Sequence, residues 1–188
     1  RFYPALVGND IGCGMALWRT DIPTAKLHLD KLEKRLGNLD LPLDESWQEA
    51  VAGFELPTTG HERSLGTIGG GNHFAELQQL DESYDDAALA ALNIERKHLL
   101  LLVHSGSRGL GEAILREQVD LFGHQGLEAG SDASSHYLSR HDGALRFAEA
   151  NRQLIARRML ERLRADGERL LDINHNLVSP ARVDGFDG

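Results

Sequence analysis

Five side chains that can bind metals lie in glycine-rich turns or at the ends of apolar segments of this sequence. They are one carboxylate, one thiol and three imidazoles: Asp10, Cys13, His73, His104 and His175. Loops at the ends of rigid strands can direct several side chains to one point. We therefore expect the five to converge on a site for divalent cations, which thiolate, carboxylate and imidazole groups can share.

Asp10 and Cys13 stand three residues apart in a turn with glycines at positions 8, 12 and 14. The glycines let the backbone turn so that the carboxylate and the thiol point the same way. The alternative is a structural cysteine beside a turn aspartate, because free cysteines are commonly buried. These two residues alone leave both interpretations open.

Residues 65–76, Leu-Gly-Thr-Ile-Gly-Gly-Gly-Asn-His-Phe-Ala-Glu, offer successive backbone N–H groups of the kind that cradle phosphate oxygens. The segment is neither a Walker A loop nor a Rossmann fingerprint, because it lacks the spacing that each requires. A flexible turn is the alternative. The amide of Asn72, the imidazole of His73 and the carboxylate of Glu76 follow the glycines, and this favours a functional site.

His104 follows the most hydrophobic segment of the chain, residues 97–103, and precedes a Ser-Gly-Ser turn, Arg108 and a predicted helix. A strand, a turn and a helix in this order form an anion site, here with an arginine added. The alternative is that His104 ends the strand and Ser107 caps the helix.

His175 follows a short apolar strand in the same way, and Asp172 is a candidate partner that would orient its ring. The other six histidines lie on predicted helix faces or in polar loops, where solvated or structural roles are expected. They occupy positions 28, 61, 98, 124, 136 and 141.

Hydrophobic periodicity predicts the elements that must position these residues. Strands are expected at residues 15–21, 97–103 and 170–173, and residues 72–77 begin either a strand or a helix. Helices are expected at residues 25–36, 44–52, 86–92, 110–122 and 143–165. Loops are expected at residues 53–71 and 126–135, where glycine and polar residues replace the periodic pattern.

The continuous apolar segment 97–103 predicts a strand that is covered on both faces. Arginines on the last helix predict a solvated, ion-paired face rather than a nucleic-acid groove. They are Arg146, Arg152, Arg157, Arg158, Arg162 and Arg164. Since the sequence shows no internal repeat and no linker, the predicted elements form one α+β unit.

Composition and charge exclude several classes of protein. The 188 residues, 41% hydrophobic and 26% charged, are those of a globular chain rather than a disordered or fibrous one. The longest apolar run, residues 99–103, is far shorter than the roughly 20 residues of a membrane span. A formal net charge of -9 excludes a general basic coat, so any nucleic acid must be held locally.

The single cysteine excludes an intramolecular disulfide, and no secretory signal is visible, so a cytoplasmic location is expected. The sequence starts without Met and stops in a glycine turn. We therefore expect residues 1–188 to be one segment of a longer chain.

Four motifs resemble the RtcB family of RNA-splicing ligases and occur in family order along nearly the whole chain. They lie at residues 7–15, 65–76, 103–109 and 172–176, and a Phe-Ala-x-x-Asn-Arg stretch at 147–152 resembles a further part of the family. The Asp-Ile-Gly-Cys-Gly-Met and Gly-Gly-Gly-Asn-His-Phe blocks are the most specific. The resemblance implies an α+β fold of mixed sheets with packed helices and a metal site at the strand ends.

By this resemblance the protein is a GTP- and manganese-dependent ligase of RNA splicing or repair. It joins RNA ends that carry a 3'-phosphate or a 2',3'-cyclic phosphate to 5'-hydroxyl ends. Two cations would neutralise the triphosphate and polarise phosphorus, while a histidine accepts GMP. Zinc is an expected competitor, because a Cys/His set binds it more tightly than manganese. RNA, GTP and an activating protein are the expected partners, with no membrane.

The same resemblance assigns roles to the candidate residues. Cys13 bridges two Mn²⁺ ions, Asp10 and His73 complete one site, and His104 and His175 complete the other. Arg108 is the residue expected to hold an RNA phosphate. The residues expected to contact GTP are Asn72, His73, Phe74, Ala75, Glu76, His175 and Asn176.

The sequence departs from the family pattern in one important respect. The guanylylated histidine of the family lies in a His-Arg-Lys-Gly-Ala-like motif downstream of the last block, and no such motif is present. We therefore expect a catalytic-core segment that lacks N-terminal and C-terminal portions of the family domain and is inactive alone. The short stretch between Cys13 and His73 suits a compact subgroup encoded beside a release-factor-like protein. Two alternatives remain: a non-catalytic metal- and nucleotide-binding module, and a metal-dependent phosphoesterase acting on RNA ends.

Overall fold

A four-stranded antiparallel sheet forms the centre of the molecule. The computed structural model describes residues 1–26, 28–180, 182–183 and 186–187. The strands are β1 (Gly14–Pro23), β2 (Phe74–Gln78), β3 (His98–Ser105) and β4 (Gly167–Asn174), in the order β2-β3-β1-β4. A separate pair joins β5 (Arg182–Val183) to β6 (Phe186–Asp187). The α+β class predicted from the sequence is confirmed.

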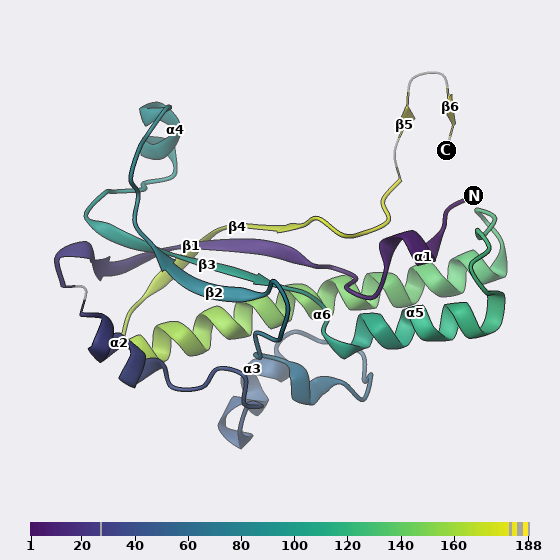
Figure 1. Ribbon diagram of the computed structural model, residues 1–188, viewed down its shortest axis with the longest axis horizontal. Coiled ribbons are helices and arrows are strands. Elements are labelled where there is room, and N and C mark those ends of the chain that lie inside the picture. The colour runs from purple at the N-terminus through teal and green to yellow at the C-terminus, as the bar shows by residue number, and fades with distance from the viewer. Residues whose placement is uncertain (27, 181, 184–185, 188) are drawn as a thin grey trace.

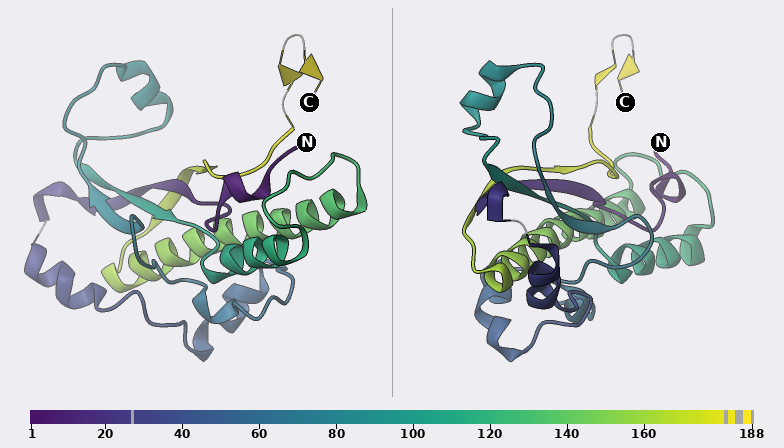
Figure 2. Two further views of the ribbon diagram at one scale, coloured as in Figure 1. Left: turned by 45° about the vertical axis from the view of Figure 1, so that its right-hand side comes forward. Right: turned by 60° about the vertical axis from the view of Figure 1, so that its left-hand side comes forward.

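The long helix α6 (Asp132–Leu163) runs along one face of the sheet, and α5 (Gly109–Phe122) lies beside it (Figure 1). Burial alternates along β3, where Leu99, Leu101 and Val103 are buried and Leu100 and Leu102 are partly exposed. The expectation that this strand is covered on both faces is therefore wrong. Helices cover the sheet from one side only, as Figure 2 also shows.

The remaining helices are short. They are α1 (Pro4–Val7), α2 (Leu29–Leu36), α3 (Gln48–Ala52) and α4 (Asp86–Ala91), with single turns η1 (Thr24–Lys26), η2 (Glu45–Trp47) and η3 (Glu62–Ser64). Helices α2 and α3 pack against α6. Helix α4 stands in the connection between β2 and β3, which projects away from α6 (Figure 2). No helix in the described parts of the chain is both long and apolar enough to cross a membrane.

Two helix starts differ from the sequence prediction. The last helix begins at Asp132 rather than near residue 143, because Ser131 caps it by accepting the backbone N–H of Ser134. Residues 132–135, predicted as loop, belong to this helix. The first predicted helix begins at Leu29 instead of residue 25, and it ends at Gly37 as expected.

The hydrophobic core has two parts. One lies between α5 and α6 and includes Ile11, Leu65 and Phe147. The other lies between the sheet and α6 and includes Trp18 and Leu101. Helix α6 contributes to both, so it is the element that connects the sheet to the loops at its edge.

Candidate metal centre

The strand register brings the predicted metal-binding residues to one end of the sheet. Gly14 pairs with Ser105 on β3 and with Asn174 on β4, and Phe74 pairs with His104. A Cβ atom on Gly14 would lie 2.4 Å from the carbonyl oxygen of Ile173, so only glycine allows β1 and β4 to meet here. Each candidate ligand therefore lies at or beside this end of the sheet.

Three of the candidate donor atoms form a compact triangle. The Cys13 Sγ atom lies 3.1 Å from His104 Nε2 and 3.3 Å from His175 Nε2, and the two Nε2 atoms are 3.3 Å apart. His104 Nδ1 is 3.1 Å from the carbonyl oxygen of Asn72. Because that oxygen accepts a hydrogen bond from the Nδ1–H group, the lone pair of the neutral ring is left on Nε2, toward the triangle.

A second group of donors shares the same thiol. His73 Nε2 is 2.8 Å from Asp10 Oδ2 and 3.7 Å from Cys13 Sγ. The two groups, Cys13 with His104 and His175 and Asp10 with Cys13 and His73, each have all ligand atoms within 4.8 Å of one another. Ligands at about 2.0–2.3 Å from one ion are themselves roughly 3–4 Å apart. The spacing and the donor chemistry of both groups fit a metal ion.

Burial and hydrogen bonding shift the pKa values of Cys13, His104 and Asp10. Burial raises the pKa of the Cys13 thiol to about 12, and the Asp10 carboxylate raises it as well. Burial lowers the pKa of His104, which keeps this imidazole neutral near pH 7. Burial would raise the pKa of Asp10, but hydrogen bonds from His73 and Cys13 outweigh it and the net shift is downward. The pocket thus offers a carboxylate and neutral imidazole around a thiol that must lose its proton to bind a metal.

Arg152 of α6 connects the three strands that carry the triangle. Its fully buried guanidinium donates from NH1 to the carbonyl oxygens of Gly12, at 2.8 Å, and Ser105, at 3.0 Å. Its NH2 donates to Asn174 Oδ1 at 2.7 Å, and its Nε donates to Asp172 Oδ1 at 2.8 Å. The first three partners are chain neighbours of Cys13, His104 and His175, so one side chain fixes their relative positions.

Asn151 connects the glycine-rich loop, residues 65–73, to the same end of the sheet. It accepts the backbone N–H of Gly66 at 2.7 Å and donates to the Thr67 carbonyl oxygen at 3.2 Å. The same amide nitrogen lies within 3.3 Å of Ser105 Oγ and the carbonyl oxygen of Gly106. The loop that leads to His73 is therefore anchored from beneath by a fully buried amide.

Two expectations about polar residues are corrected by these contacts. The arginines of α6 do not all lie on a solvated face, because Arg152 and Arg158 are buried. The signal was present in the sequence, since Asn151 and Arg158 share the apolar helical stripe of Leu154. Asp172 bonds Arg152 rather than serving as the partner that orients the histidine three residues later.

The side chain of Arg108, at the start of α5, packs against the glycine-rich loop beside the metal centre. A Cβ atom on Gly69 would lie 1.6 Å from Arg108 NH1, so the guanidinium occupies the space that any side chain at position 69 would need. Arg108 Nε is 3.4 Å from Thr67 Oγ1. Ser107 makes no side-chain cap to α5, whose N-cap residue is Arg108 itself. Arg108 is partly exposed.

Not all of the residues expected to contact GTP point to the open face of the sheet. Phe74 and Glu76 both lie on the open face of β2, and Asn72 is exposed beside them. The ring of Phe74 packs edge-on against that of His104, with 5.4 Å between the ring centroids. The side chain of Ala75 packs against the core beneath the sheet. Asn176 donates to the carbonyl oxygens of Val7 and Asp10, so its amide nitrogen braces the Asp10 turn.

His141 is fully buried and has a structural role, as expected for the histidines outside the cluster. Its Nε2 accepts the backbone N–H of Val178 at 2.9 Å and so holds the segment that follows His175. A backbone bond also holds His175 itself, because its N–H donates to the Cys13 carbonyl oxygen at 2.9 Å.

Comparison with known proteins identifies the family. The family model described as tRNA-splicing ligase RtcB matches residues 54–184. An RNA-splicing ligase RtcB2 of Escherichia coli is 51% identical over 188 residues, which cover 100% of this chain and 50% of the relative. A tRNA-splicing ligase RtcB of Nanoarchaeum equitans is 30% identical, over 81% of this chain and 44% of the relative. The chain spans about half the length of these curated relatives, and it belongs to the RtcB family.

Proposed function

We propose that this chain is the metal-binding core of a GTP- and manganese-dependent RNA ligase. In this reaction a 3'-phosphate or 2',3'-cyclic phosphate end of RNA is joined to a 5'-hydroxyl end. The observation that carries the proposal is the position of Cys13, whose Sγ belongs to both groups of donors. A thiolate shared in this way would hold two ions close together, and two close ions can stabilise both the attacking and the leaving oxygen of a phosphoryl transfer.

The chain's own residues supply distinct parts of the site. Asp10 and His73 would hold one ion and His104 and His175 would hold the other, with Cys13 available to both. Two bound cations would neutralise phosphate oxygens and polarise the reacting phosphorus. Arg152 and the Asn72 carbonyl oxygen keep Cys13, His104 and His175 in place, so binding on that side of the site needs little rearrangement.

GTP and RNA are proposed to occupy the open side of this centre. Phe74 and Glu76 lie on the uncovered face of β2, next to exposed Asn72 and His175, and offer an aromatic edge and a carboxylate to the nucleotide. Asn176 and the backbone at Ala75 border the same end of the sheet. Arg108 provides the cation for an RNA phosphate, because a guanidinium matches two phosphate oxygens.

The proposal is tested on a full-length protein that contains this segment. With Mn²⁺ and GTP it should join an RNA 3'-phosphate to a 5'-hydroxyl, become labelled by radioactive GTP, and lose both properties on Cys13→Ala. The 188-residue segment should bind Mn²⁺ without joining RNA. Metal and GTP binding without labelling would replace the proposal with a non-catalytic module. Phosphate release from the RNA end without GTP would replace it with a phosphoesterase.

A further inference from the structure

A hollow of about 650 Å³ lies between the C-terminal end of α6 and the segment 41–47. Three arginines line it: Arg158, Arg162 and Arg164. No carboxylate oxygen among the described residues lies within 4.0 Å of any of them, whereas five other arginines make such ion pairs. The hollow therefore gathers positive charge that the described protein does not neutralise by contact.

Two of the guanidiniums are held firmly while keeping donors free. Arg158 is 4% exposed and donates from NH1 to the carbonyl oxygens of Leu39, at 3.0 Å, and Gly66. Arg162 donates from NH1 to the carbonyl oxygen of Leu36, the last residue of α2. A guanidinium carries five N–H donors, so most donors of each group remain for a ligand in the hollow.

The charges in the hollow favour an anion. Burial lowers the pKa of Arg158, and the nearby charge of Arg162 lowers it further. Asp44 and Glu161 also line the hollow, and Asp44 already accepts the backbone N–H of Ser46 at 3.0 Å. An anion placed among the three guanidiniums would relieve their repulsion, and a phosphate presents several oxygens to do so.

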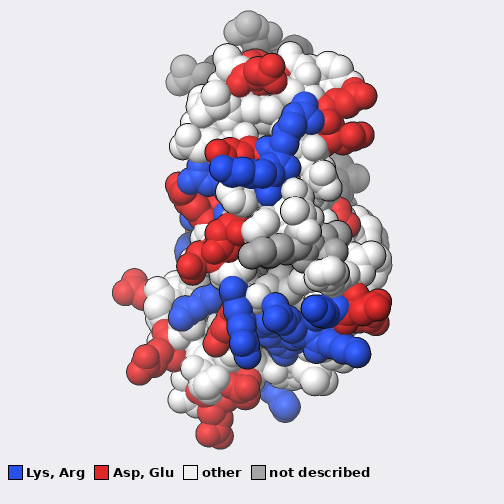
Figure 3. Space-filling view, turned by 90° about the vertical axis from the view of Figure 1, so that its left-hand side faces the viewer, with Lys and Arg blue, Asp and Glu red and all other residues white. Residues whose placement is uncertain are grey.

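The surface around the hollow extends this charge. Lysine and arginine side chains gather over α2 and the C-terminal end of α6 in Figure 3, and exposed Lys31, Lys34 and Arg35 belong to α2. This is a local feature, because the whole chain has a formal net charge of -9. A long backbone can use such a surface, whereas a small anion needs only the hollow.

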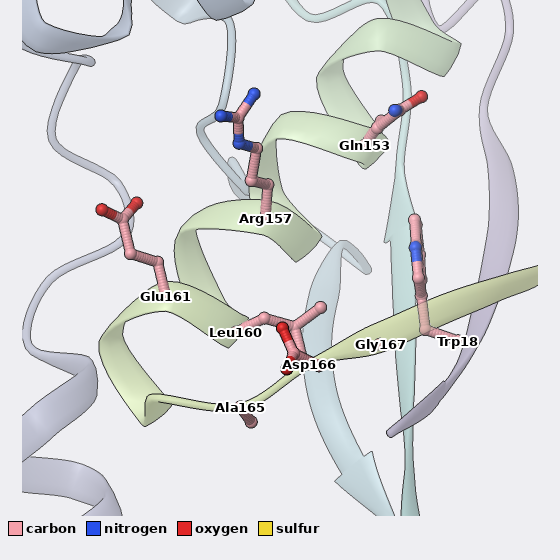
Figure 4. A pocket seen from close by; sticks show the side chains of 8 residues that line it. All are labelled: Trp18, Gln153, Arg157, Leu160, Glu161, Ala165, Asp166 and Gly167. Atoms are coloured by element: carbon pink, nitrogen blue, oxygen red, sulfur yellow. The ribbon is translucent and has the colours of Figure 1, made fainter. Parts of the chain in front are cut away.

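A second hollow of about 500 Å³ on the same part of α6 lacks this character. It is lined by Trp18, Gln153, Arg157, Leu160, Glu161, Ala165, Asp166 and Gly167. Figure 4 shows Arg157 and Glu161 projecting from successive turns of α6, and Asp166 adds a second carboxylate to the lining, so one arginine is accompanied by two carboxylates. Mixed charge of this kind gives no preference for phosphate.

The glycine-rich loop links the arginine hollow to the metal centre. Arg158 contacts this loop at Gly66, and Arg108 lies on it at Gly69. From Arg152 to Arg164, α6 advances about 18 Å at 1.5 Å per residue. A stacked strand covers this distance with about five nucleotides at about 3.4 Å each.

We propose that the arginine hollow binds a backbone phosphate of an RNA strand whose reacting end lies at the metal centre. The identity of the strand as RNA rests on the proposed function, and the preference for phosphate rests on the hollow alone. Binding here would hold RNA through its backbone, without reading its bases. The site would make affinity depend on RNA length, because only a strand that spans both positions reaches it.

The test measures fluorescence anisotropy of labelled single-stranded RNAs of about three and about ten nucleotides, shorter and longer than the estimated span. Arg164→Glu should weaken binding of the longer RNA about tenfold, equivalent to about 1.4 kcal/mol. It should lower the slope of log affinity against log salt by about 0.7, and leave the shorter RNA unchanged. Arg164→Lys should retain length dependence, and both variants keep a Cβ atom at this left-handed position.

Lys97→Glu is the matched control, because Lys97 is exposed and directly precedes β3, outside the hollow. It should bind both RNAs as the unsubstituted chain does. Equal binding of the longer RNA by Arg164→Glu and by the unsubstituted chain would overturn this inference and leave the proposed ligase intact. Failure of the unsubstituted chain to bind either RNA would overturn the inference and count against the proposed RNA substrate too. Competition by inorganic phosphate without length dependence would identify a small-anion site instead.

Discussion

The two halves of the candidate metal centre differ in how ready they are for an ion. Around His104 and His175, three donor atoms form a nearly regular triangle with sides of 3.1 to 3.3 Å. Around Asp10 and His73, the two donors bond each other at 2.8 Å, and the thiol lies farther away at 3.7 Å. A metal in the second half must replace the short bond between Asp10 and His73, whereas a metal in the first half replaces only the longer contacts among Cys13, His104 and His175.

The difference follows from the support that α6 gives to each half. Arg152 contacts the neighbours of Cys13, His104 and His175, and so fixes the first half through buried bonds. The backbone carbonyl oxygen of Asp10 accepts a hydrogen bond from Asn176, but the carboxylate of Asp10 is partly exposed. We expect the His104 half to fill first and the Asp10 half second.

The largest effect is expected from Cys13→Ala, because the thiol is common to both halves. Binding of both Mn²⁺ ions should be lost in anaerobic calorimetry, beyond the about 10–100-fold cost of removing a residue behind a ligand. Circular dichroism provides the control that the variant is folded. Retention of either ion at its original affinity would show that the halves do not share this residue.

Arg152→Lys should weaken the affinity for the first Mn²⁺ ion by about 10–100-fold. The single ammonium group of lysine cannot replace the planar guanidinium, which bonds the neighbours of all three ligands. The same calorimetric titration measures this change. Arg157→Lys is the matched control on the same helix, since Arg157 is exposed. If both variants bind as the unsubstituted chain does, Arg152 does not support the first half.

Gly106→Ala should affect the second half selectively. A Cβ atom at this position would lie 2.1 Å from Asp10 Oδ1, so the carboxylate must move. We expect the weaker ion to be lost and the tighter one to remain in the titration. Gly70→Ala is the control, because a Cβ atom there meets nothing within 4 Å. Loss of the tighter ion in Gly106→Ala would reverse the assigned order of filling.

The smallest effect is the pH dependence of the first binding step. The Cys13 thiol, with a pKa of about 12, is protonated at neutral pH and must release its proton when it binds metal. The affinity for the first ion should therefore rise about tenfold for each pH unit between about pH 6.5 and pH 8. Titrations in buffers of different ionisation enthalpy would measure the released proton. An affinity that stays level across this range contradicts thiolate ligation.

The sequence predicted where the donor residues lie better than it predicted the buried contacts that hold them in place. Residues at strand ends were expected to meet, and the antiparallel register does bring Gly14 opposite Ser105 and Asn174. The buried position of Arg152 was missed because a long charged side chain is usually solvated. Its partner Gly12 is 140 residues away in sequence, a separation over which no periodicity gives a signal.

The two faces of the sheet show the same limit. An apolar run at residues 97–103 predicts a strand, but it does not distinguish a strand covered on both faces from one with a partly exposed face. The structure resolves this through helix α6, which lies on one side only. The start of that helix depends on the cap at Ser131, a single side-chain contact within a polar segment.

Electron paramagnetic resonance of the chain loaded with two equivalents of Mn²⁺ tests the shared thiolate most directly. We predict the spectrum of two exchange-coupled ions, because one sulfur atom would join them at close range. The coupling should be absent when one equivalent is bound. A doubly loaded chain that gives the spectrum of two isolated ions would contradict the bridging role of Cys13 and, with it, the proposed two-ion centre.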